Sequence, residues 1–343
     1  MPTPSTQTTA SAAPKKESQR AAWSKALIEL GEQDPRVVVV GADTTGSLMT
    51  DKFRAKFPDR LVNVGIAELS MTTIAAGMAL SGKVVFSATF AVFGVGHVYN
   101  HIRQSIAYPK ANVKIVSSHA GTTTGADGAT HQMNEDVGLL AGLPNFTVVV
   151  PADAPETYKA TKAIHAVEGP CYMRISRENF PTVSEGREFR LGKADVYREG
   201  EDVALMANGI MVSRALEAAD ELKKRGVSAA VINIHTPKPL DEAAVESWAR
   251  RCGAIVTAEE HTVVHGTGSL IANVCAKRYP VPMRFVGVQD VFGESGKSDE
   301  LLAKYGMTSG EIVKGALEVL KKQSLAAAGL DGGAASRESD AHN

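Results

Sequence analysis

The chain has 343 residues, of which 44% are hydrophobic and 22% charged, and its formal net charge is -1. This length predicts two domains, at roughly 100–200 residues each, whose cores need no disulfides. The near-neutral charge argues against a nucleic-acid or membrane-surface binder, and no apolar stretch approaches the ~20 residues of a membrane span.

The three cysteines are few, odd in number and far apart. Cys171, Cys252 and Cys275 form no Cys-x-x-Cys pair. This usage argues against a disulfide scaffold or a cysteine zinc site and predicts a cytoplasmic protein. Residues 1–14 are rich in Ser, Thr, Ala and Pro without an apolar core, and 325–343 lack periodicity. Both ends are therefore expected to be disordered tails, the first one not a secretory signal.

Short apolar runs alternate with helical patterns through the first half of the chain. Helical spacing of Ala22, Ala26, Leu27 and Leu30 precedes a four-valine run at 37–40. Unbroken runs of this length are typical of parallel strands buried on both faces. The alternation predicts an α/β domain over 15–182 with a mainly parallel sheet. The further strands expected are 61–64, 83–87, 113–117, 146–150 and 172–175, and the further helices 67–80, 94–106 and 155–167.

The pattern pauses near 180–192, where Pro, Gly and charged residues cluster, and then begins again. A second, smaller α/β domain is therefore expected over 190–324. Its expected strands are 203–207, 229–234 and 254–258, and its expected helices are 212–225 and 241–250.

Polar residues follow several of the expected strands of the first domain. In open α/β sheets ligands bind beyond the carboxyl ends of the strands. The sequence therefore predicts one site at a single sheet edge. The residues concerned are 43–47 after the valine run, Glu68, Phe90, the segment His119 to His131, and Arg177.

The glycine-rich segment 118–131 is the strongest single signal, because long irregular loops in compact domains are usually functional. It carries His119, Asp127 and His131. An ordinary solvated loop is one alternative. A zinc site with His97 and His101 is another, although no carboxylate or cysteine completes a metal pattern.

Glu68 and the pair Phe90 and Phe93 each have a structural and a functional interpretation. An acid that starts a helix can simply complement the helix dipole. Two phenylalanines three residues apart can simply be core residues, or they can clamp a flat heterocycle in an apolar pocket.

Taken together, these motifs resemble those of a known family. Asn63-Val-Gly-Ile-Ala-Glu68 with Thr89-Phe-Ala-Val-Phe93 resembles the pyrimidine-binding domain of thiamine-diphosphate enzymes. The spacing of His119, Asp127 and His131, together with Ser176-Arg177, resembles the transketolase family. Ala42-Asp-Thr-Thr-Gly-Ser47 and Arg20 upstream of it fit the same pattern, and the resemblance runs from about 20 to 322. Gly96 stands where the family usually has a third aromatic residue.

The sequence contains no Gly-Asp-Gly, which transketolases use in their first half to hold the diphosphate and its metal. The chain therefore resembles the C-terminal half of a split transketolase: a pyrimidine-binding domain followed by a Rossmann-like C-terminal domain. The resemblance implies an N-terminal, diphosphate-binding partner subunit, with two copies of each chain. The coenzyme would be shared, and the partner would hold Mg²⁺ or Ca²⁺, with no metal bound by this chain.

The resemblance also implies a role for each residue. Glu68, His119 and His131 would be catalytic, with Glu68 at N1′ of the aminopyrimidine and Phe90 and Phe93 flanking its ring. Asp127 would recognise a sugar hydroxyl. The reaction would move a two-carbon unit from a ketose phosphate to an aldose phosphate, as in pentose phosphate metabolism. The remaining substrate contacts, around its phosphate, would come from Arg20, Ser47, His119 and Arg177.

Other interpretations remain at this point. The chain could be the β-type E1 subunit of a 2-oxo acid dehydrogenase, half of a 1-deoxyxylulose-5-phosphate synthase-like enzyme, or a non-catalytic paralogue that regulates a partner. In the second domain, the segments 259–261 and 265–268 follow a strand. They are interpreted as structural, with a small regulatory or interface site as the alternative.

Overall fold

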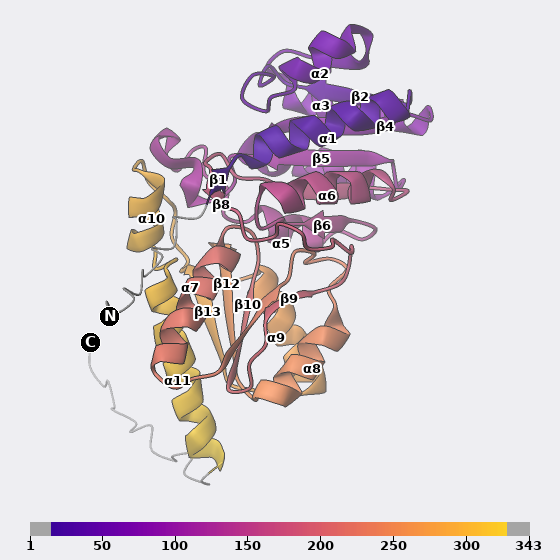
Figure 1. The fold of residues 1–343 in the computed structure, drawn as a ribbon. Helices are drawn as coiled ribbons and strands as arrows, with labels where there is room; N and C mark the ends of the chain where they lie inside the picture. The colour runs from indigo at the N-terminus through magenta and orange to yellow at the C-terminus, as the bar shows by residue number, and fades with distance from the viewer. Residues whose placement is uncertain (1–14, 328–343) are drawn as a thin grey trace, which may run out of the picture.

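The computed structural model describes residues 15–327 and consists of two α/β domains in sequence, each built on its own sheet (Figure 1). A two-stranded antiparallel ribbon, β1 (Lys16–Glu17) with β8 (Phe180–Pro181), ties the start of the first domain to its end. The α/β class and the two-domain organisation predicted from the sequence are confirmed.

The first sheet has six strands, all parallel, in the order β3-β2-β4-β5-β7-β6. Every residue of β2, β5 and β7 is buried, and β2 is the unbroken valine run that this burial favours. β5 and β7 also bury polar residues, among them Lys114 and Arg174. The strands are β2 (Val37–Gly41), β3 (Leu61–Asn63), β4 (Val84–Phe90), β5 (Val113–Ser118), β6 (Thr147–Val149) and β7 (Cys171–Arg174).

Helices cover both faces of this sheet. α1 (Gln19–Gln33) and α6 (Ala154–His165) pack together on one face, where Trp23 and Leu27 are completely buried. The helices α3 (Glu68–Leu80) and α5 (Asp136–Ala141) cover the other face. α2 (Asp51–Lys56) and the 3₁₀ turn η1 (Pro58–Arg60) precede β3.

The helix expected over 94–106 is not a regular α-helix. The chain there forms a π-helical turn, η2 (Val92–Gly96), one α-helical turn, α4 (Tyr99–His101), and a second π-helical segment, η3 (Ile102–Ala107). Wide π turns are often found at functional sites. Gly94 explains part of the geometry, because a Cβ there would come within 2.8 Å of the Thr89 Cγ2 atom.

The segment 118–131 was also wrongly expected to lack regular structure. It contains a 3₁₀ helix, η4 (Thr122–Asp127), whose three threonines are completely buried. The sequence could not show this burial, because the covering atoms come from the second domain.

The second sheet has five strands in the order β13-β12-β10-β11-β9, parallel except for the edge strand β9. Helices α7 and α11 pack on one face and α8 and α9 on the other, while α10 packs on η4. The strands are β9 (Asp195–Arg198), β10 (Val203–Ala207), β11 (Ala229–Asn233), β12 (Ile255–Thr262) and β13 (Met283–Val288). The helices are α7 (Met211–Lys224), α8 (Glu242–Cys252), α9 (Thr267–Arg278), α10 (Ser298–Lys304) and α11 (Ser309–Ala327).

α11 continues to Ala327, so the disordered tail expected from 325 begins too early by at least three residues. The rest of that tail and the tail expected at 1–14 lie outside the described residues. None of the described helices is long and apolar enough to span a membrane.

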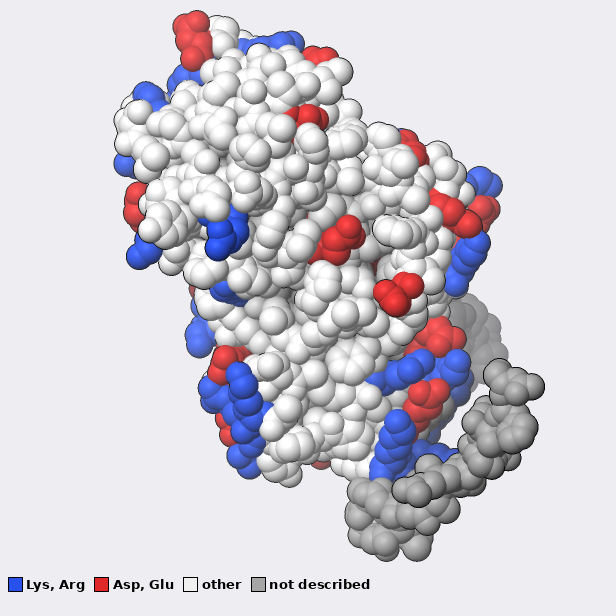
Figure 2. Space-filling model, turned by 180° about the vertical axis from the view of Figure 1, so that it is seen from behind, with Lys and Arg blue, Asp and Glu red and all other residues white. Residues whose placement is uncertain are grey.

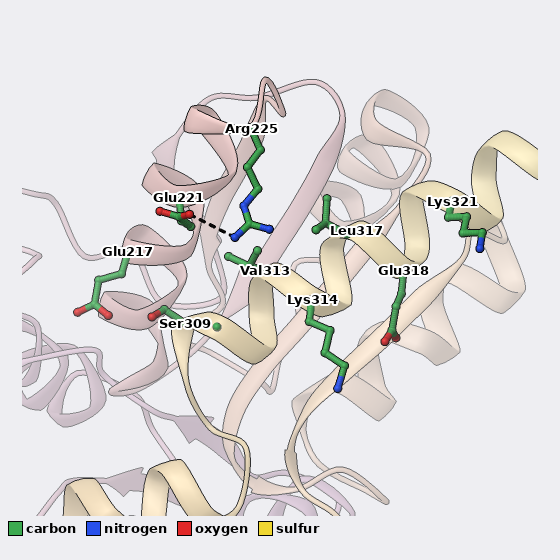
Figure 3. Close-up of a pocket in the computed structure, with 10 residues that line it drawn as sticks. Glu217, Glu221, Arg225, Ser309, Val313, Lys314, Leu317, Glu318 and Lys321 are labelled. Carbon is green, nitrogen blue, oxygen red and sulfur yellow. Dashed lines mark hydrogen bonds and ion pairs between the residues drawn. The ribbon is translucent and has the colours of Figure 1, made fainter.

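A groove on the surface of the second domain lies between α7 and α11 (Figure 3). It has a volume of about 680 Å³ and a rim that carries both charges, including Glu221, Arg225 and Lys314. None of the site residues expected from the sequence lines it.

A buried carboxylate, Glu156 of α6, joins the two domains away from the site. It accepts hydrogen bonds from the Ala152 N–H at 2.6 Å and from the Asn233 amide of β11 at 2.9 Å. Burial raises the pKa of Glu156 to about 7, against the stabilising effect of these donors on its charged form.

We predict that Glu156 makes the protein less stable as the pH rises. Its pKa is higher in the folded than in the unfolded chain, so its contribution is complete below pH 4.5 and is lost as the pH passes 7. The shift corresponds to about 3 kcal/mol in the free energy of unfolding. Thermal unfolding of the wild type and of Glu156→Gln between pH 5 and 8.5 measures this.

The Glu156→Gln variant should lose less stability than the wild type over that range. The exposed residue Glu185 provides the control, Glu185→Gln, which should follow the wild type. Parallel pH profiles for wild type and Glu156→Gln would contradict the prediction.

Candidate active site at the carboxyl edge of the first sheet

An aromatic stack forms the centre of the predicted site. Phe90 ends β4, and its ring lies 3.8 Å from the imidazole of His119, nearly parallel to it. Phe93, on η2, stacks on Phe90 at 6.2 Å and meets the ring of His131 edge-on at 5.3 Å. Four of the predicted side chains therefore stack on or touch one another, although the phenylalanines and the histidines come from different parts of the sequence.

His119 follows β5 and is held in an uncommon backbone conformation. Its φ is 57°, in the left-handed region that non-glycine residues seldom adopt and that is found at functional sites. The Ser118 hydroxyl lies 2.7 Å from its Nδ1 atom. Burial, with Arg20 and Arg177 nearby, lowers the pKa of His119 to about 3. The ring is therefore neutral at physiological pH. It can donate and accept hydrogen bonds without adding positive charge to the site.

Two arginines supply the positive charge of the site. Arg20, on α1, donates to the backbone carbonyls of Ser47 and Arg177, both at 2.8 Å. Its Nε atom is buried and has no hydrogen-bond partner among the described residues. Burial, and then the charge of Arg177, lowers the pKa of Arg20. A bound anion would give the Nε atom a hydrogen-bond partner and would oppose the lowering of this pKa.

Arg177 follows β7 and reaches across to η4. Its Nη1 group donates to the Thr124 carbonyl and lies 3.4 Å from the Asp127 carboxylate. Ser47 takes part through its backbone only, and its side chain is exposed. The structure thus connects Arg20, Ser47, Arg177 and Asp127 in one chain of contacts.

Glu68 stands apart from this group. It is the first residue of α3 and is 9% exposed, yet no hydrogen bond or ion pair within residues 15–327 involves its carboxylate. α3 packs against β4 and η2, which carry Phe90 and Phe93. A mostly buried carboxylate without a protein partner indicates a ligand atom as its partner.

The alternative zinc site receives no structural support. His97 is exposed, and no group of three or more His, Cys, Asp or Glu side chains in the described part of the chain is placed to hold a metal ion.

Sequence reasoning missed the residues that support the site from behind. The side chain of Asn63 accepts hydrogen bonds from the N–H groups of Asp43 and Gly65 and so fixes the turn before α3. Arg174, Asp136 and the second-domain residue Glu260 form a buried charged cluster beneath η4. Within this cluster, the sequence singles out only Glu260, in the segment 259–261 that was expected to follow a strand. The structure places this segment inside β12 (Ile255–Thr262).

Comparisons with known proteins identify the family of both domains. The transketolase pyrimidine-binding domain matches residues 15–183 and the transketolase C-terminal domain matches 192–312. A putative transketolase C-terminal section from Methanocaldococcus jannaschii is 39% identical over 308 residues, 89% of this chain and 96% of that protein. A 6-deoxy-6-sulfo-D-fructose transketolase subunit from a Clostridium species is 42% identical over 300 residues, 87% of this chain and 93% of its own length.

A solved structure gives the same result in three dimensions. A split-gene transketolase, described as an inactive β4 tetramer, is 44% identical to this chain with a TM-score of 0.83. The match covers 90% of this chain and 99% of that one. The chain therefore belongs to the transketolase family, with the pyrimidine-binding and C-terminal domains of that family in sequence.

Proposed function

We propose that this chain is the C-terminal subunit of a split transketolase, which moves a two-carbon ketol unit from a ketose phosphate to an aldose phosphate. The observation that carries the proposal is the juxtaposition, at one sheet edge, of an aromatic stack, a carboxylate without a partner among the described residues, and two arginines. One of these, Arg20, has a buried N–H that is unpaired within the same residues. A flat heterocycle and a phosphate are the ligands that these groups suit.

The residues present fit the pyrimidine end of thiamine diphosphate. The free carboxylate of Glu68 would hold a proton against the N1′ nitrogen, and Phe90 and Phe93 would bind the ring faces. When bound, the coenzyme supplies the carbanion that attacks a ketose carbonyl. The chain's own part is to orient the ring and to keep the N1′ proton in place.

The sugar end of the site fits a polyhydroxylated phosphate ester. Asp127 would accept a hydrogen bond from a sugar hydroxyl. His119, in its neutral form, and His131 would bind the hydroxyls near the reacting carbons. Arg20 has a buried N–H, unpaired within the described residues, that could donate to a phosphate oxygen. Arg177 already donates one N–H to the Thr124 carbonyl of η4. Guanidinium groups match phosphate geometry better than ammonium groups do.

A partner subunit is part of the proposal. α3 lies on the face of the first sheet opposite α1 and α6, and Figure 2 shows the molecule from that side, where few charged side chains interrupt the upper surface. Three exposed apolar side chains lie within α3 or just before it: Ile66, Leu69 and Ile74. Exposed apolar patches of this kind mark protein interfaces.

We assign this face to an N-terminal subunit that holds the diphosphate through Mg²⁺ or Ca²⁺, in an assembly with two copies of each chain. The related β4 tetramer is described as inactive, which supports the need for such a partner. Three free, buried cysteines support a reducing, cytoplasmic location.

We predict that Glu68→Gln removes most turnover and leaves assembly intact, because an amide cannot share a proton with N1′ as a carboxyl group does. The expected loss is ~10²–10⁴-fold in kcat at saturating coenzyme. Steady-state kinetics of the reconstituted complex measures it. Asp51→Asn is the matched control, because Asp51 also begins a helix but lies outside the site. Retention of more than about a third of wild-type activity would refute the role of Glu68.

We predict that Arg177→Ala raises KM for phosphorylated sugars by roughly tenfold or more, through loss of a charge-assisted contact. Unphosphorylated analogues should be affected much less. The control is Arg190→Ala, which removes an arginine that is 69% exposed and remote from the site. Because Arg177 also holds the Thr124 carbonyl, equal losses on both substrate types would assign it to loop structure instead.

We predict that the purified chain alone is inactive and binds thiamine diphosphate weakly. The negative charge of the diphosphate needs a cation, and we assign that cation to the partner. Calorimetric titration with coenzyme and Mg²⁺, first without and then with the partner, tests this. Micromolar binding together with ketose turnover by the chain alone would overturn the split site.

A further inference from the structure

The end of strand β12 brings three consecutive polar residues to the junction of the two domains. Glu259, Glu260 and His261 are 2%, 6% and 0% exposed. Glu259 serves its own domain, because its carboxylate accepts hydrogen bonds from the N–H groups of Thr267 and Gly268 at the start of α9, at 2.7 and 2.8 Å. Successive side chains of a strand point to opposite sides, so the side chain of Glu260 points away from the side on which Glu259 lies.

Glu260 faces the first domain. Its Oε1 atom accepts a hydrogen bond from the Thr123 N–H at 2.7 Å, and its backbone carbonyl accepts one from Arg174 at 2.6 Å. The approach is so close that a Cβ at Gly121, where φ is 77°, would lie 2.3 Å from the Glu260 carboxylate. Only glycine fits that turn.

This contact continues directly into the site. Thr123 belongs to η4, and the carbonyl of the next residue, Thr124, accepts the Arg177 hydrogen bond. η4 ends at Asp127, which lies 3.4 Å from the same guanidinium. The residue that Glu260 holds, Thr123, is therefore next to the residue that Arg177 holds, Thr124, and lies in the same short helix as Asp127.

The second domain holds the same segment from another side. The Ser298 hydroxyl, at the start of α10, donates to the Thr123 carbonyl at 3.0 Å. The Gln132 amide, which follows η4, donates to the Glu294 carbonyl at 2.8 Å. Both the N–H and the C=O of Thr123 are thus bound by side chains of the second domain.

A carboxylate in this place is costly. Burial raises the pKa of Glu260, and the nearby charge of Arg174 opposes the shift. Asp136, also completely buried, already pairs with Arg174 at 3.3 Å, so Glu260 is not needed to neutralise that arginine. Its distinguishing contact is the one to η4.

We propose that Glu260 is a positioning residue of the site: from the second domain, it fixes η4 and thereby the placement of Asp127 and Arg177. The proposal rests on the proposed function, which assigns these two residues to the sugar phosphate. It gives the C-terminal domain a part in substrate binding.

The kinetic test uses the reconstituted complex with three variants. Glu260→Ala should lower kcat/KM for ketose phosphates about tenfold or more, mainly through KM, with the affinity for coenzyme unchanged. Glu260→Gln retains an oxygen acceptor for the Thr123 N–H and should recover most of the loss. Glu259→Gln is the matched control: it changes the adjacent, equally buried carboxylate and should lower the melting temperature without changing KM.

Hydrogen exchange of the amides in 121–128, measured on the complex and on this chain, is the readout that needs no activity. Exchange there should become faster in Glu260→Ala and stay unchanged in Glu259→Gln. If Glu260→Ala does not fold, Glu260→Asp keeps the charge but draws the carboxylate back from Thr123, and the same increase is expected.

Unchanged exchange at 121–128 in the Glu260 variants overturns the positioning role, whatever the activity. Kinetic losses that follow the melting temperature equally in the Glu259 and Glu260 variants also overturn it. If the wild-type complex turns over no ketose while Glu260→Ala still releases η4, the proposed function fails and the structural contact stands.

Discussion

The buried guanidinium of Arg174 is the interaction on which the rest of the site depends. It ends β7, three residues before Arg177, and is 6% exposed. It pairs with Asp136 of the first domain and donates to the Glu260 carbonyl of the second. A charge buried in this way is tolerated only with close partners, so the two domains cannot separate here without exposing or orphaning it. The edge of the first sheet is thereby held against the end of β12.

Next to this buried cluster, the site combines an uncharged aromatic part with a positively charged part. The stack of Phe90, Phe93 and His119 is apolar and, because burial and two arginines depress the pKa of His119, uncharged. Arg20 and Arg177 lie beside it and carry positive charge that the described protein groups only partly satisfy. A ligand with a flat heterocycle close to an anionic, hydroxylated substrate suits both parts, which is what the proposed reaction requires.

Two exposed features, one on each domain, have different meanings. The exposed apolar side chains of α3 lie on the helix that begins with Glu68, so covering them would also close the end of the site that we assign to the pyrimidine. The groove between α7 and α11 has a volume of about 680 Å³ and lies on the second domain, where its charged rim includes the ion pair of Glu221 with Arg225. The volume of a groove is therefore a poor guide to the functional site of this protein. The buried carboxylate of Glu68, which has no partner within residues 15–327, is a better one.

The sequence by itself determined the two α/β domains and the central strands of their sheets, because parallel strands buried on both faces are dominated by apolar runs. It also placed Phe90, His119, Asp127 and Arg177 at one edge, since parallel strands end on the same side. It did not predict the edge strands β9 and β13, which are only partly buried. Only the tertiary structure decided the rest. The π turns around Phe93 and the burial of η4 depend on close contacts with distant residues, and local periodicity carries no trace of these. The neutral state of His119 depends first on its burial and then on Arg20 and Arg177, which are remote in sequence. The role of Glu260 depends on a second domain folding against the first, so its polar character could be read from the chain but its partner could not.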